Sequence, residues 1–177
     1  MSLNLFERTL PASRAAGALL TAAAAVTAVV LFGPQMLRMV AHASPHGPDL
    51  ALFVAQSPVL KVHVLAAIAG VGVGAIILSA RKGRTFHRTM GWIWVMLMGL
   101  TAGASLFIVG LNGNHWSLIH LLSGWTLVTL PLAVRAARKH NVKVHGPAMT
   151  SLFWGASIVA GAFTFLPGRL MWNLFFG

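Results

Sequence analysis

The stretch VLKVHVLAAIAGVGVGAIILSA, residues 59–80, decides the class of fold. Its only Lys, Arg, Asp or Glu residue is Lys61, and it is long enough to cross the hydrocarbon core of a bilayer, which takes about 20 apolar residues. The whole chain has the same character, because 57% of its 177 residues are hydrophobic and 8% are charged. Soluble domains carry about 25% charged residues. This composition therefore excludes a soluble monomer, and its hydrophobicity excludes a disordered chain.

Four further apolar runs predict an all-α integral membrane protein with about five transmembrane helices. The predicted spans are 15–32, 59–80, 89–111, 116–134 and 147–166. Spans two to five are expected to form a four-helix core with the first span packed outside it, so that residues 1–177 make a single transmembrane domain. Residues 34–58 then form a loop on the outer side. We expect the first span to be retained and not cleaved as a signal peptide.

Basic residues are distributed unequally between the predicted loops. The net charge is +11, and ten of the thirteen lysine and arginine residues fall on one side of the predicted spans: Arg8, Arg14, Arg81, Lys82, Arg84, Arg88, Arg135, Arg138, Lys139 and Lys143. The positive-inside rule then predicts an N-terminus inside and a C-terminus outside. The same rule explains the basic charge without a nucleic-acid partner, and the lipid bilayer is the expected partner.

Four of the eight histidines lie near the ends of the predicted spans. Spans two and four run in the same direction, so His63 and His120 share the outer level, while His87 and His145 share the inner level on spans three and five. At 1.5 Å per residue the two levels are about 20 Å apart. Haem iron takes two axial imidazoles from opposite faces of the porphyrin. The pattern therefore predicts two haem b groups in the four-helix core, with these four histidines as the axial iron ligands.

The same four histidines also fit roles that involve no haem. A histidine near the end of a span is often only a hydrogen-bonding residue at the headgroup level, and zinc or copper sites usually take a third or fourth ligand. A proton path through a transporter is less favoured, because few polar residues line the middle of the spans. Gly91 and Gly124, one turn from two of the histidines, would leave room for a porphyrin. Small residues also serve close helix packing, which is the commoner role of Gly70-x-x-x-Gly74.

Cations and aromatic residues near the ends of the spans have functional and structural interpretations. Arg88 at the inner level, and Lys61 and Arg169 at the outer level, are candidates to contact haem propionates or an anionic substrate. Trp92 and Trp94 fit an aromatic belt at the inner boundary of the membrane. The sequence has no cysteine, no phosphate-binding loop and no serine-hydrolase motif, so it predicts no catalytic residues.

Several short motifs together resemble a bacterial family of predicted membrane proteins, domain of unknown function 2306. The resemblance covers about residues 59–170 and rests on Lys61-x-His63, Gly83-x-x-x-His87-Arg88-x-x-Gly91, His145 followed by Met149, and AGAFTFLPGR at 160–169. The resemblance implies a multi-pass protein of the bacterial cytoplasmic (inner) membrane and says little of its function.

The order of the histidines is also similar to that of the di-haem cytochrome b-561 group. That resemblance implies the same pairs, His63 with His120 and His87 with His145, and electron transfer across the membrane from a small reductant such as ascorbate or from a quinol. The chain departs from the group in its five spans, where six are common, and in histidines nearer the helix ends. We expect a di-haem transmembrane electron carrier, that is, an oxidoreductase. The alternative is a haem-free packing or accessory subunit of a larger membrane complex; a homodimer is also compatible with the sequence.

Overall fold

The computed structural model describes residues 33–108 and 118–177. The first predicted span, 15–32, lies outside the described residues, as do the end of the third span and the beginning of the fourth. The chain divides into two compact units. The first unit consists of residues 1–45 with the last two residues of the chain, and it is helical over residues 33–41. The second unit, residues 46–175, contains the four histidines of interest.

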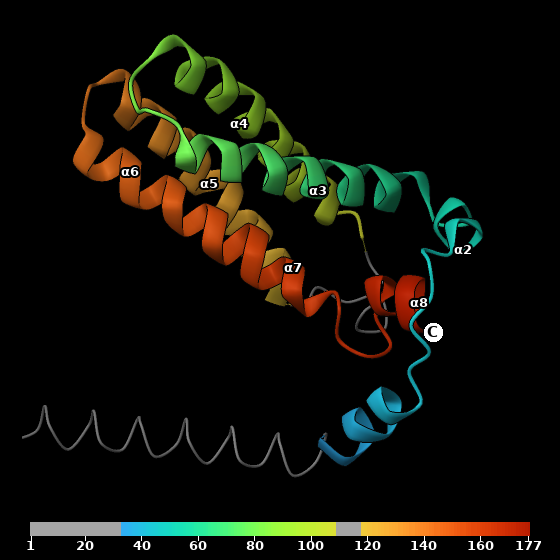
Figure 1. Ribbon diagram of the computed structural model, residues 1–177. Coiled ribbons are helices and arrows are strands. Elements are labelled where there is room, and N and C mark those ends of the chain that lie inside the picture. The colour runs from blue at the N-terminus through green and yellow to red at the C-terminus, as the bar shows by residue number, and fades with distance from the viewer. Residues whose placement is uncertain (1–32, 109–117) are drawn as a thin grey trace, which may run out of the picture. The chain divides into compact units, whose positions relative to one another are not determined.

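Regular structure in the described part of the chain is entirely helical (Figure 1). The elements are α2 (Leu50–Val54), α3 (Pro58–Ser79), α4 (Thr85–Ser105), α5 (Leu118–Arg138), α6 (Val142–Ser151), the π-helix η1 (Leu152–Val159), α7 (Ala160–Phe163) and α8 (Leu170–Phe176). From α6 the chain continues through η1 into α7 without a break, so residues 142–163 form one helical segment.

Local sequence explains where these helices begin and end. Ser57 caps α3 by accepting a hydrogen bond from the Leu60 N–H, and Pro58 occupies the first turn, where its missing N–H costs nothing. At the other end of α3 the Lys82 ammonium donates to the Ile77 and Ala80 carbonyls at 3.2 and 3.1 Å. A cation there satisfies carbonyls that have no partner within the helix and complements the helix dipole.

The long helices pack in a closed ring. α3 lies against α4, α4 against α5, α5 against α6 and η1, and η1 against α3. α3 and α5 therefore occupy alternate positions in the ring, as do α4 and the α6–η1 segment. Buried apolar side chains from three sides of the ring form the core, namely Trp94, Met98, Leu130, Leu152 and Phe153. The belt prediction is wrong for Trp94, which is 5% exposed, whereas Trp92 is half exposed.

Two helices in the described part of the chain, α3 and Ile119–Arg138 of α5, are long and apolar enough to cross a membrane. Large apolar side chains on these helices face outward: Leu65, Ile68, Val128 and Leu132 are each more than half exposed. Soluble proteins rarely expose contiguous apolar patches of this kind. The structure thus supports a helical membrane protein.

The helix ends differ from the predicted spans on three helices; α5, for example, ends at Arg138, where the sequence predicts 134. α4 begins at Thr85 and ends at Ser105, where the sequence predicts 89–111. The last helical segment begins at Val142, where the sequence predicts 147, because Asn141 caps it by accepting from the Val144 N–H. Because α4 and the last helical segment begin earlier than predicted, His87 and His145 each lie in the first turns of a helix.

Candidate functional site

The two histidines predicted at the inner level, His87 and His145, interact electrostatically from α4 and α6. The ring of His145 is fixed, because its Nδ1 lies 3.0 Å from the main-chain oxygen of Ala133 in α5. A carbonyl oxygen only accepts, so Nδ1 donates and the neutral ring keeps its lone pair on Nε2. Histidines that bind metals are commonly oriented by a second-shell bond of this kind.

His87 contributes a buried ring nitrogen to the same end of the bundle. Its Nδ1 has no hydrogen-bond partner among the described residues. Burial of the ring, together with the nearby charges of Lys82 and His145, lowers the pKa of His87, which lies before the third predicted span. The neutral form of a histidine is the form that binds metals. An unpartnered buried nitrogen is costly and is the kind of group that a ligand would satisfy.

His63, predicted at the outer level, has the same kind of second-shell bond as His145. Its Nδ1 lies 2.8 Å from the main-chain oxygen of Thr101 in α4. Nδ1 again donates, and Nε2 keeps the lone pair. The hydroxyl of Thr101 donates to the Leu97 carbonyl at 2.8 Å, within α4. His63 and His145 thus occupy opposite ends of the bundle with the same tautomer fixed.

His120, the predicted partner of His63, is buried in a small polar layer between α4 and α5. It is 3% exposed, and the hydroxyls of Ser105 and Ser123 lie 2.9 Å apart one turn away. Thr101, which His63 contacts, lies one turn before Ser105 in α4. Ser105 is the residue that Ser123 contacts. His120 precedes Ser123 by a further turn, toward the outer end of α5. Of the two predicted pairs, the inner one, His87 and His145, is the pair whose members interact electrostatically among the interactions described above.

The glycines near the histidines divide into two kinds. A Cβ added at Gly91 or Gly124 would meet no atom within 4 Å, so the space beside both positions is open. Gly74 is the opposite case, because its Cβ would meet the buried rings of Phe153 and Trp94. The sequence expectation of close packing is confirmed for Gly74, whereas the room for a porphyrin beside Gly91 and Gly124 stays a prediction.

The three candidate cations lie at the two ends of the bundle. Lys61 donates from Nζ to the Val54 carbonyl at 3.0 Å and so joins the end of α2 to α3. Arg88 follows His87 in the first turn of α4, and Arg169 precedes α8; both are exposed. Within residues 33–108 and 118–177, no three of the His, Asp and Glu side chains lie together in a metal-binding group. A two-histidine iron site does not need such a group.

The family model described as "Predicted membrane protein (DUF2306)" matches residues 60–177. The chain belongs to this family. The match begins inside α3 and includes all four predicted ligand histidines, so the resemblance over residues 59–170 is confirmed. The likeness to the cytochrome b-561 group stays a prediction. Comparison with curated proteins and with solved structures finds no match to the chain.

Sequence reasoning missed the carbonyl groups that orient the DUF2306 histidines. Thr101 and Ala133 act through their main chains, and every residue has a carbonyl, so no residue type marks these positions. Only the helix register decides which carbonyl reaches a given ring. Their positions give a weak signal of this role. Thr101 and Ala133 each lie shortly before the end of a helix, and that helix is adjacent to the helix that carries the histidine.

Proposed function

We propose that the protein is a di-haem b-type electron carrier of the bacterial cytoplasmic membrane. In this proposal the chain crosses the membrane five times, with its N-terminus inside and its C-terminus outside, and spans two to five form the four-helix core. The observation that carries the proposal is the inner histidine pair. His145 is fixed by the Ala133 carbonyl with its Nε2 lone pair available, and His87 holds a buried Nδ1 without a hydrogen-bond partner among the described residues.

The packing of the helices supports this donor set. His87 and His145 come from α4 and α6, and α4 and the α6–η1 segment occupy alternate positions in the ring. Open space lies beside Gly91, one turn from His87. Two imidazoles without a carboxylate or thiolate are a ligand set that suits haem iron. His63 and His120 form the proposed second site toward the outer end.

Haem iron, when bound, supplies reversible one-electron chemistry. The part played by the chain is to hold the imidazoles of His63 and His145 in one tautomer and to exclude water with the apolar core around Trp94 and Phe153. Arg88 is proposed to meet anionic propionates at the inner site, and Lys61 and Arg169 to meet propionates or an anionic substrate at the outer site. The proposed electron donor is a small reductant or a quinol.

The test is a reduced-minus-oxidised visible spectrum of the full-length protein, purified from a host supplied with a haem precursor, with haem measured per chain. We expect a b-type spectrum and about two haems per chain, the number of proposed bis-histidine sites. His87→Ala and His145→Ala are each expected to lose the same one haem. His140→Asn is the matched control, because His140 is exposed and has φ 55°, a conformation that asparagine tolerates.

The remaining outcomes separate the alternatives. One haem per chain, lost in His87→Ala, would confine binding to the inner pair and dismiss electron transfer across the membrane by this chain alone. No haem in the wild-type protein would overturn the proposal and leave the haem-free accessory subunit of a larger membrane complex in its place.

A further inference from the structure

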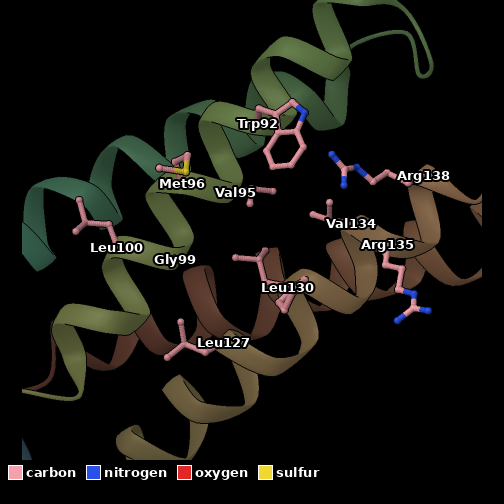
Figure 2. A pocket seen from close by; sticks show the side chains of 11 residues that line it. Trp92, Val95, Met96, Gly99, Leu100, Leu127, Leu130, Val134, Arg135 and Arg138 are labelled. Carbon is pink, nitrogen blue, oxygen red and sulfur yellow. The ribbon is translucent and has the colours of Figure 1, made fainter.

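An apolar groove of about 840 Å³ lies between α4 and α5 (Figure 2). Its α4 wall includes Trp92, Met96 and Leu100, and its α5 wall includes Leu127, Leu130 and Val134. The volume falls within the range of about 300–1,000 Å³ that small-molecule sites occupy. The groove is separate from the proposed iron sites, and none of the four predicted ligand histidines lines it.

Two arginines line one end of the groove, and Figure 2 shows the side chain of Arg138 reaching toward Trp92. Arg135 and Arg138 both line it, and the Arg138 guanidinium carbon lies 5.8 Å from the centroid of the Trp92 ring. That distance is within the range of a cation–π interaction. The chain has two acidic side chains, Glu7 and Asp49, and Asp49 caps α2 by accepting from the Leu52 N–H. No carboxylate side chain of the described residues therefore balances the charge at this end of the groove.

The length of the groove indicates which kind of molecule it could hold. From Leu127 to Arg138 the α5 wall rises about 16 Å at 1.5 Å per residue. The hydrocarbon core of a bilayer is about 30 Å thick, so the groove has the depth of one leaflet. A transmembrane helix would need contact over twice this length. An acyl chain of a single leaflet matches it, and its headgroup would lie at the level of the two guanidinium groups.

We propose that this groove binds one acidic phospholipid, with its anionic headgroup at Arg135 and Arg138 and an acyl chain along the apolar walls toward Leu100 and Leu127. The geometry favours a lipid because the charged groups stand at one end and the rest of the lining is apolar. Charge-assisted hydrogen bonds from two guanidinium groups suit a phosphate. The proposal does not depend on whether the chain binds haem.

The test uses Trp92 as a reporter, because it lines the groove. The full-length protein is placed in nanodiscs of phosphatidylcholine that contain a minor fraction of phosphatidylglycerol with brominated acyl chains, which quench indole fluorescence on contact. The chain has six tryptophans, so the difference between the wild-type protein and Trp92→Phe gives the Trp92 component. We expect brominated phosphatidylglycerol to quench this component more strongly than brominated phosphatidylcholine at the same mole fraction. The Trp92 fluorescence in each brominated lipid is divided by the Trp92 fluorescence in the same lipid without bromine.

Removing positive charge should reduce the preference for the acidic lipid only when the charge belongs to a residue that lines the groove. With Arg135→Gln and Arg138→Gln together, the preference for the acidic lipid is expected to fall about fivefold for each guanidinium removed. Arg84→Gln with Lys139→Gln removes the same charge outside the groove and should leave the preference intact. Gly99→Leu keeps all charges but fills the floor of the groove, where Leu130 lies 4.0 Å from an added Cβ, and should weaken quenching by both lipids.

Three results would overturn the proposal. Equal quenching by the two brominated lipids would show that the groove does not select an acidic headgroup. An equal loss of preference in the Arg84→Gln/Lys139→Gln control would assign the effect to diffuse surface charge. Absence of quenching by either lipid would show that the groove is covered by protein, such as a second copy of the chain.

Discussion

At the scale of single residues, Gly74 sets how closely α3 approaches the last helical segment. A Cβ at this position would lie 2.5 Å from Cδ2 of Phe153 and 2.7 Å from Nε1 of Trp94. Both rings are 5% exposed and belong to the buried core, so neither can move aside without disturbing its neighbours. Close packing around a small residue is the main way in which helices associate in a membrane.

Gly74→Ala is therefore expected to lower the stability of the protein. Overpacking a core costs about 1–3 kcal/mol, which outweighs the gain of up to about 1 kcal/mol from alanine's helix propensity. Gly72→Ala is the control on the same helix, because its Cβ would meet no atom within 4 Å. Thermal unfolding of both variants in detergent gives the comparison. A Gly74→Ala variant as stable as Gly72→Ala would contradict the close approach seen here.

At the scale of elements, α4 and α5 are joined differently along their length. The Ser123 hydroxyl bonds to the Ser105 hydroxyl at 2.9 Å near one end, while the groove lined by Trp92 and Val134 separates the helices toward the other. Among the described residues, the hydroxyl of Thr126, one turn from Ser123, bonds within its own helix, to the Leu122 carbonyl at 2.9 Å. The serine pair is thus a polar link between the two helices, one turn from His120.

A double-mutant cycle on Ser105→Ala and Ser123→Ala should show a coupling free energy of about 0.6 kcal/mol, the average for interhelical hydrogen bonds in membranes. The measurement is the unfolding free energy of the wild-type protein, the two single variants and the double variant. Ser105→Ala with Thr126→Val provides the matched cycle, in which a coupling near zero is expected. Equal coupling in the two cycles would show that the serine bond contributes nothing specific.

At the scale of the whole molecule, charge is concentrated in two loops. Arg81, Lys82 and Arg84 follow α3, and Arg138 and Lys139 end or follow α5. α3 and α5 both lead into these loops, so they place the two basic groups at the same end of the ring. The positive-inside rule then predicts that this end faces the cytoplasm.

Labelling of single cysteines checks this orientation without background, because the sequence contains no cysteine. Ala51→Cys and Lys139→Cys place a thiol at exposed positions at the α2 end and the basic end of the ring. A membrane-impermeant maleimide is expected to label Ala51→Cys in intact cells and Lys139→Cys only after the cells are broken. The reverse pattern would invert the proposed topology, and labelling of both in intact cells would refute the crossing between them.

The sequence predicts some helix boundaries and side-chain positions well and others poorly. Residues 59–80 were predictable almost to the residue as α3, because the apolar run and the Ser57 cap coincide. The start of α4 was not, because the backbone after Gly83, at φ 79°, leads into a polar first turn that hydropathy does not register. Trp94 was misplaced because its depth in the span does not reveal which face of the helix meets the core. The carbonyls that hold His63 and His145 depend on packing alone.

The π-helix η1 has a consequence for how the family sequence can change. Its turns use more residues than the 3.6 of an α-helix, because each hydrogen bond reaches one residue further. Removing one residue between Leu152 and Val159 would let a turn close as ordinary α-helix, with the ends of the segment kept nearly in place. The same deletion in α3 would rotate every later side chain away from its neighbours. Single-residue insertions and deletions among members of the family should therefore be most frequent in η1. An alignment gap there indicates a change between π-helix and α-helix, and the helical segment itself is kept.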